Sequence, residues 1–141
     1  MRFMVMRKAD PETEAGAMPS SQLIADMTTF HEEAAKAGVV IGGAGLQPTS
    51  RGARVKFDNG QPTITDGPFA ETKELIAGYT LIEVASLEAA IEWVKDWPTL
   101  DGHGNVEIDI RRLYTEEDFG EAYTEAMATK EAARKALGTP R

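Results

Sequence analysis

The chain has 141 residues, of which 42% are hydrophobic, and its 15 basic and 23 acidic side chains give a formal net charge of −8. This length and hydrophobic content predict one compact domain that buries roughly two thirds of the surface exposed by the unfolded chain. The negative charge disfavours direct binding to nucleic acid or to an anionic membrane surface. Because the sequence contains no cysteine, disulfide bonds, a thiolate nucleophile and a cysteine-ligated zinc site are excluded.

Residues 2–7 predict a first β-strand with apolar side chains on both faces. Phe3 and Val5 alternate with Met4 and Met6, so each pair points to one side of a sheet. We therefore expect both sides of this strand to be buried. The apolar run is also too short for the core of a signal peptide or for a membrane span, which favours a soluble, cytoplasmic protein.

An irregular segment and a helix follow the first strand. Residues 8–19 contain two prolines and a glycine and lack periodicity, so we expect an exposed loop. Residues 20–37 begin with serines that suit the N-cap position and place their apolar side chains on one helical stripe. This pattern predicts a core helix that is ended by Gly38.

The glycine-rich segment 42–45 continues a short apolar strand at residues 39–41. It partly resembles a phosphate-binding loop, but Pro48 stands where a dinucleotide fingerprint has its third glycine, and no helix pattern follows. We therefore interpret the glycines as a bend in the strand or as a close approach of two backbones.

The second half of the chain predicts a hairpin, two strands and a helix. Asn59-Gly60 is a strong hairpin signal because both positions accept positive φ. The same periodicity arguments give the remaining elements. They are strands at 53–57, 61–65 and 75–84, a helix at 86–97 and a strand at 106–111.

The order of these elements is typical of a ferredoxin-like, split βαβ fold of the α+β class with an inserted hairpin, here over residues 1–114. In this fold two helices cover one side of an antiparallel sheet. Because the first strand is apolar on both faces, we expect a second copy to cover the other side and to form a dimeric α/β barrel. Residues 115–141 form an extension, whose predicted helix at 116–137 we expect to dock or swap across the dimer.

A turn, Asp66-Gly67-Pro68-Phe69, joins the hairpin to the long strand. Glycine tolerates positive φ and proline fixes φ, so we expect a rigid structural turn that Phe69 anchors in the core. With its continuation, Ala70-Glu71-Thr72-Lys73-Glu74 and Gly78-Tyr79, the motif resembles that of the DGPF type of YCII-related proteins, and the likeness covers roughly residues 2–114. The resemblance also implies the dimeric barrel.

Three acidic or basic residues around the turn are candidate site residues. Asp66 is either a general base, a group that orients the substrate, or a carboxylate that hydrogen-bonds to its own turn. Glu71 and Lys73 are two apart in a segment that we expect to be extended, which would place them on the same side. There they either bind a polar substrate together or are simply solvated.

Asp109 and Arg111 are neighbours on the charged face of the last strand, which also carries Glu107. The planar fork of an arginine suits a substrate carboxylate, but a salt bridge in the dimer explains the pair equally well. In the family this strand usually reads Glu-x-Arg-Pro. Here it reads Asp109-Ile110-Arg111-Arg112, so the arginine matches and the acid is shortened.

The family resemblance implies a His and Asp pair that does acid–base chemistry on small lactone-like molecules. This makes His31 a candidate base, although its place at the flank of a helical stripe is more typical of a half-buried border residue than of a base. His103 lies in a turn whose composition needs no other explanation. A calcium loop is excluded, because Val106 and Arg112 replace the required glycine and glutamate. We expect no metal.

Two classes of function remain for this sequence. The first is a cofactor-free enzyme that acts by proton transfer on a small carbonyl, lactone or phenolic compound. Asp66 or His31 would be its base, and Arg111 or Lys73 would bind an anionic group. The second is a non-catalytic homodimer that binds a small polar ligand or has a regulatory role. For this class the family resemblance implies a sigma-factor-like protein partner, to which the acidic surface is suited.

Overall fold

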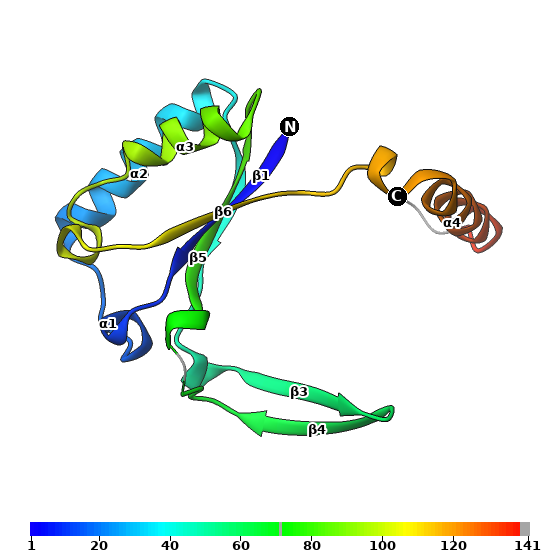
Figure 1. The fold of residues 1–141 in the computed structure, drawn as a ribbon, viewed down its shortest axis with the longest axis horizontal. Coiled ribbons are helices and arrows are strands. Elements are labelled where there is room, and N and C mark those ends of the chain that lie inside the picture. The colour runs from blue at the N-terminus through cyan, green and yellow to red at the C-terminus, as the bar shows by residue number, and fades with distance from the viewer. Residues whose placement is uncertain (71, 139–141) are drawn as a thin grey trace.

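The computed structural model describes residues 1–70 and 72–138, without the side chains of residues 73 and 123. Four strands form an antiparallel sheet in the order β2-β5-β1-β6, and two more form a separate hairpin (Figure 1). This order is that of the ferredoxin-like fold and confirms the α+β class. The strands are β1 (Arg2–Lys8), β2 (Val40–Gly45), β3 (Ala53–Asp58), β4 (Gln61–Asp66), β5 (Ile76–Glu83) and β6 (Ile108–Arg112), and the helices are α1 (Pro11–Glu14), α2 (Ser21–Lys36), α3 (Leu87–Lys95) and α4 (Glu116–Ala136).

The helices α2 and α3 lie together on one face of the four-stranded sheet (Figure 1). Each begins at the serine that the sequence predicts, since Ser20 Oγ accepts from the backbone N–H of Leu23 and Ser86 Oγ from that of Ala89, both at 3.1 Å. The core between sheet and helices contains Phe3, Val5, Ile82 and Ala90, all buried. Burial of side chains the size of Phe3 or Val5 stabilises the fold by about 1.5–3 kcal/mol each.

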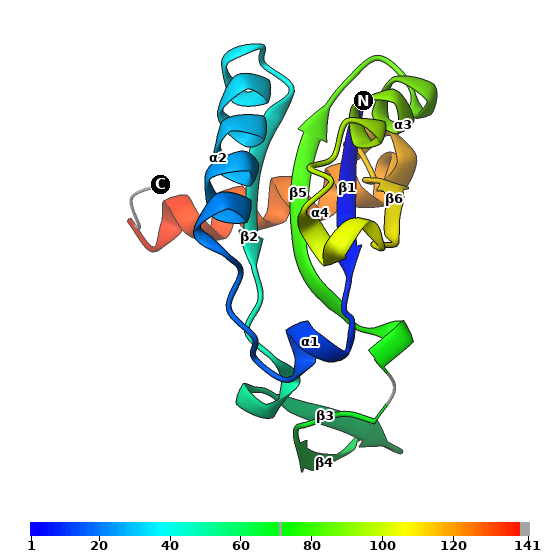
Figure 2. The ribbon, with the colours of Figure 1, turned by 90° about the vertical axis from the view of Figure 1, so that its left-hand side faces the viewer.

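The opposite face of the sheet is not covered by a helix within the described residues (Figures 1 and 2). Residues that are directly opposite on neighbouring antiparallel strands share a face. Met4 is opposite Leu81 and Arg111, and Met6 is opposite Tyr79 and Asp109. Together with Lys8, two residues after Met6 on β1, these side chains form what we call the open face. It consists of Met4, Met6, Lys8, Tyr79, Leu81, Asp109 and Arg111.

Two arms extend from the same side as the open face (Figure 1). One is the β3–β4 hairpin, whose Asn59-Gly60 turn has positive φ at both residues, as the sequence predicts. The other is α4, which is separated from its own first turn by a break at Gly120 (φ 66°, ψ −151°). None of the described helices, α4 included, is long and apolar enough to cross a membrane.

Two local predictions are wrong and one is confirmed. The expected loop at residues 8–19 contains α1, because Asp10 caps a short helix that starts at Pro11 and forms a capping box with Thr13. Lys73 lies in a short 3₁₀ helix, Thr72–Glu74, and not in an extended segment. The glycines of β2 do allow a close approach, since a Cβ atom at Gly43 would lie 2.6 Å from the carbonyl oxygen of Tyr79.

Candidate functional site

The Asp66–Phe69 turn is fixed to the start of the chain through Thr49. The backbone N–H of Phe69 donates to Thr49 Oγ1 at 2.9 Å. The Thr49 hydroxyl donates in turn to a carboxylate oxygen of Glu14 at 2.6 Å, and the Thr49 backbone N–H donates to the other oxygen at 3.0 Å. Gly67 N–H donates to the carbonyl of Gly52 at 3.1 Å. The turn is therefore held by hydrogen bonds to residues that the sequence pattern did not single out.

Phe69 does not anchor this turn in the core, which corrects the expectation from the sequence. Its ring is half-buried, lies outside the core cluster and stacks under the guanidinium of Arg54, whose Cζ is 4.1 Å from the ring centroid. Because the hairpin projects away from the sheet (Figure 1), a side chain at its base cannot reach the space under α2 and α3. The contact is a cation–π interaction at the surface.

Phe69→Ala is accordingly expected to lower the free energy of unfolding by about 1–2 kcal/mol, the sum of a partial burial term and a cation–π term. Phe3→Ala, at a fully buried position, serves as the control and is expected to cost about 3–5 kcal/mol. Urea unfolding of both variants gives the two values. Equal losses would mean that Phe69 is packed as tightly as a core residue.

Asp66 lies apart from the charged strand β6. Asp66 is exposed at the end of β4, opposite Ala53, in the two-stranded sheet, whereas Asp109 and Arg111 lie on β6 at the edge of the four-stranded sheet. Lys73 follows the turn, but its side chain and the whole of Glu71 lie outside the described residues. Two surface hollows lie elsewhere, one along the first half of α4 and one between Met1, Leu87 and Arg112 among others.

The charged residues of the open face are brought together by β1 and β6. Lys8 Nζ lies 3.5 Å from Asp109 Oδ2, and only 19% of the Lys8 side chain is exposed. Arg111, two residues further along β6, is exposed and forms no ion pair with the described residues. The sequence interpretation missed Lys8 because it ended the strand at residue 7. The alternation Met4, Met6, Lys8 was the available signal.

His31 lies on the other side of the sheet, between α2 and β5. Its Nδ1 is 2.9 Å from the Met27 carbonyl and its Nε2 is 3.0 Å from Thr80 Oγ1. A carbonyl only accepts, so Nδ1–H donates to it, and Nε2 shares a hydrogen bond with the threonine hydroxyl. The ring also packs edge-on against Trp93 and Trp97. With both nitrogens occupied on the helix-covered face, His31 joins α2 to the sheet.

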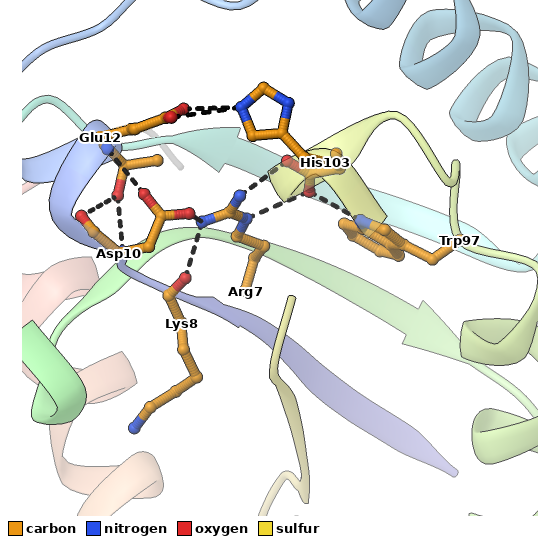
Figure 3. Close-up of polar contacts among 8 residues, drawn as sticks. Arg7, Lys8, Asp10, Glu12, Trp97 and His103 are labelled. Carbon is orange, nitrogen blue, oxygen red and sulfur yellow. Dashed lines mark hydrogen bonds and ion pairs between the residues drawn. The ribbon is translucent and has the colours of Figure 1, made fainter. Parts of the chain in front are cut away.

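A buried ion-pair network surrounds Arg7 at the end of β1 (Figure 3). Arg7 Nε and Nη2 donate to the two oxygens of Asp101 at 3.1 and 2.7 Å, and Nη1 donates to Asp10 Oδ2 at 3.0 Å and to the Lys8 carbonyl at 2.9 Å. Trp97 Nε1 donates to Asp101 as well, at 2.9 Å. We call Arg7, Asp10, Trp97 and Asp101 the Arg7 cluster. Since four of the five guanidinium N–H groups and the Trp97 N–H already donate within it, the cluster is suited to holding loops together and not to binding a ligand.

Beside this cluster His103 and Glu12 form a second, exposed pair (Figure 3). His103 Nε2 lies 3.1 Å from Glu12 Oε2, with more than half of each side chain exposed. His103 has positive φ, 56°, as expected of a turn residue. No set of three or more histidine or acidic side chains within the described residues is arranged to hold a metal ion.

Most of the chain is similar to known proteins. The model of the YCII-related domain matches residues 1–111. An uncharacterised protein of Rhizobium meliloti (strain 1021) is 35% identical over 75 residues, which are 53% of this chain and 60% of that protein, so the match spans less than two thirds of the relative. A solved structure, the 5-chloro-2-hydroxyhydroquinone dehydrochlorinase of Burkholderia phenoliruptrix AC1100 in complex with 2,5-dihydroxybenzoquinone, is 15% identical with a TM-score of 0.44, covering 83% of this chain and 98% of that one. The fold assignment therefore rests on the strand order.

Proposed function

The chain belongs to the YCII-related domain family, and within that family we propose for it the role of a cofactor-free, dimeric enzyme that transfers protons on a small anionic carbonyl, lactone or phenolic compound. The site lies on the open face, between the sheets of two copies. Asp109 accepts the proton, and Lys8 and Arg111 stabilise the negative charge that develops on a substrate oxygen. Asp66, at the base of an arm on the same side, lies at the rim of this site.

The observation that carries the proposal is the Lys8–Asp109 ion pair, in which the lysine side chain is 19% and the aspartate side chain 50% exposed, beside the apolar side chains of the open face. Met4, Met6, Tyr79 and Leu81 are half-buried side chains of the same face, and such a patch is typical of an interface. Sheets that pack face to face are about 10 Å apart and exclude water from their seam. Charged side chains at a seam therefore need a polar cavity or an oppositely charged group, and a small anionic ligand supplies that group.

Binding is tested with 4-hydroxybenzoate, a small phenolic carboxylate, by titration calorimetry. Arg111→Ala is expected to weaken binding about tenfold or more, which is the loss of one charge-assisted hydrogen-bonding group, and to leave the melting temperature nearly unchanged. Arg112→Ala is the matched control, because the neighbouring residue of β6 points to the opposite face. Sedimentation at micromolar concentration is expected to give about twice 15.3 kDa.

Proton transfer is measured separately, as deuterium incorporation from D₂O into a small carboxylated lactone. It is expected in the wild type and lost in Asp109→Asn. Binding without exchange would instead identify a ligand-binding protein without chemistry. A large fall of the melting temperature in Arg111→Ala, or a monomer in sedimentation, would remove the open face as the site.

A further inference from the structure

We propose that the two arms pair between copies of this chain, so that the apolar face of each β3–β4 hairpin packs on the apolar side of α4 from the other copy. The inference rests on the proposed dimer and adds a second contact to it. It assigns a role to the hairpin and to the segment beyond residue 111, which the family model does not cover. The partner of each arm is therefore the other arm of a second copy of the same chain.

The hairpin carries an apolar face that nothing in the described structure covers. Val55 is opposite Ile64 and Phe57 is opposite Pro62, so these four side chains share one face of the ribbon. Val55, Phe57 and Ile64 are 52%, 67% and 70% exposed. A hairpin of two strands is marginally stable in water by itself, and a third element that packs on its apolar face stabilises it. The opposite face presents Arg54 and Lys56.

The helix α4 offers a surface that fits this face. Its alanines at positions 122, 126 and 133 share one side with Leu137, the C-cap residue, at helical spacing. Small side chains let a strand face approach the helix closely, and Leu137 is 80% exposed. Glu117, before the break at Gly120, and Glu121 and Glu125, one turn apart after it, line one surface hollow and form a separate acidic stripe. A helix of this kind gains most of its stability by packing its apolar side.

The charges of the two arms and their positions favour pairing of the hairpin with α4 of a second copy. The first ten residues of α4, from Glu116 to Glu125, contain five acids and no base, whereas the charged side chains in the middle of the hairpin are the basic Arg54 and Lys56. The long side chain of Lys56 can reach around the narrow ribbon toward the acidic stripe, whereas Arg54 stacks on Phe69 of its own chain. Pairing of like arms would instead bring like charges together.

Within one chain the two arms are well separated, as both views show (Figures 1 and 2). Both arms nevertheless extend from the open-face side (Figure 1). A second sheet packed on that face places each arm next to the other copy. The break at Gly120 lies between the first turn of α4 and the rest of the helix, so the helix direction is not set by the strand that precedes it.

Cross-linking tests the pairing cleanly, because the chain has no cysteine of its own. Ile64→Cys and Ala126→Cys chains are coexpressed with different tags, purified as mixed dimers and treated with a short bismaleimide. We expect most of this sample to run at twice 15.3 kDa. Thr63→Cys, on the other face of β4, and Thr124→Cys, on the other side of α4, are the matched controls, and each should remain at the mass of one chain when paired with the opposite arm.

The remaining outcomes decide against the inference. Cross-linking of Ile64→Cys chains alone would show that hairpins pair with hairpins. A chain with both Ile64→Cys and Ala126→Cys that cross-links only within itself would show that the arms meet in one copy. A dimer in sedimentation without the mixed cross-link overturns the arm pairing but leaves the open-face dimer in place, whereas a monomer overturns both. Melting curves of the exposed-site variants confirm that they are folded.

Discussion

Arg7→Met is expected to lower the free energy of unfolding by about 3–5 kcal/mol, the usual cost of removing one partner from a buried ion pair. Arg7 is only 8% exposed, and so is Asp101, to which it donates two hydrogen bonds. Methionine keeps most of the side-chain length but no donor. Asp101 would then remain buried with the single hydrogen bond from Trp97. Urea unfolding followed by circular dichroism measures the loss.

The control for this variant is Arg2→Met on the same strand. Arg2 is exposed, and its ion pair with Glu83 is long, 3.9 Å, so its removal should change stability by no more than about 0.5 kcal/mol. Similar losses in the two variants would show that replacing any arginine of β1 by methionine destabilises the fold, and that the buried ion pair is not the cause.

The Arg7 cluster also makes the stability of the fold depend on pH in the acid range. Burial raises the pKa of Asp10. The hydrogen bond from the backbone N–H of Thr13 and the guanidinium of Arg7 together lower it by more, so that the pKa of Asp10 in the folded protein lies below its ordinary value. A lowered pKa adds stability that is present above the unfolded-state pKa, about 3.9, and is lost as the pH falls through the folded value. Arg7→Met should therefore make the loss of stability below about pH 4 shallower.

Periodicity and caps were enough to predict the order of the elements, because both are properties of neighbouring residues. The serine caps, the Asn59-Gly60 turn and the alternation of β1 each depend on a few positions. The Arg7 cluster could not be found in this way. Its central pair joins residues 94 positions apart, and no local pattern distinguishes Arg7 from any other charge that ends a strand.

The candidate site was harder to predict than the fold, since it depends on which face each charge occupies. The alternation of β6 placed Asp109 and Arg111 on one face, and the structure adds Lys8 to them. His31 has the right chemistry for a base but lies on the covered side of the sheet. Helical periodicity predicted α4 but not its packing, because no element among the described residues covers it.

Gly67→Ala is the other substitution that we expect to lower stability strongly. A Cβ atom at this residue would overlap the backbone carbonyl of Thr49. A backbone group cannot rotate away as a side chain can, so the turn or the Thr49–Arg51 segment must shift. Any such shift also breaks the hydrogen bonds that join Thr49 to Phe69 and Glu14. We expect Gly67→Ala to cost about 3 kcal/mol, at the upper end of overpacking effects.

Gly45→Ala is the matched control for Gly67→Ala, because a methyl group there meets no other atom within 4 Å. It should leave the unfolding curve nearly unchanged. Hydrogen exchange locates the defect, since a shifted turn releases the amides of β3 and β4 while those of β1 and β5 stay protected. Unchanged protection of the hairpin in Gly67→Ala would show that the turn accepts the methyl group, and that the contact with Thr49 does not fix the arm to the sheet.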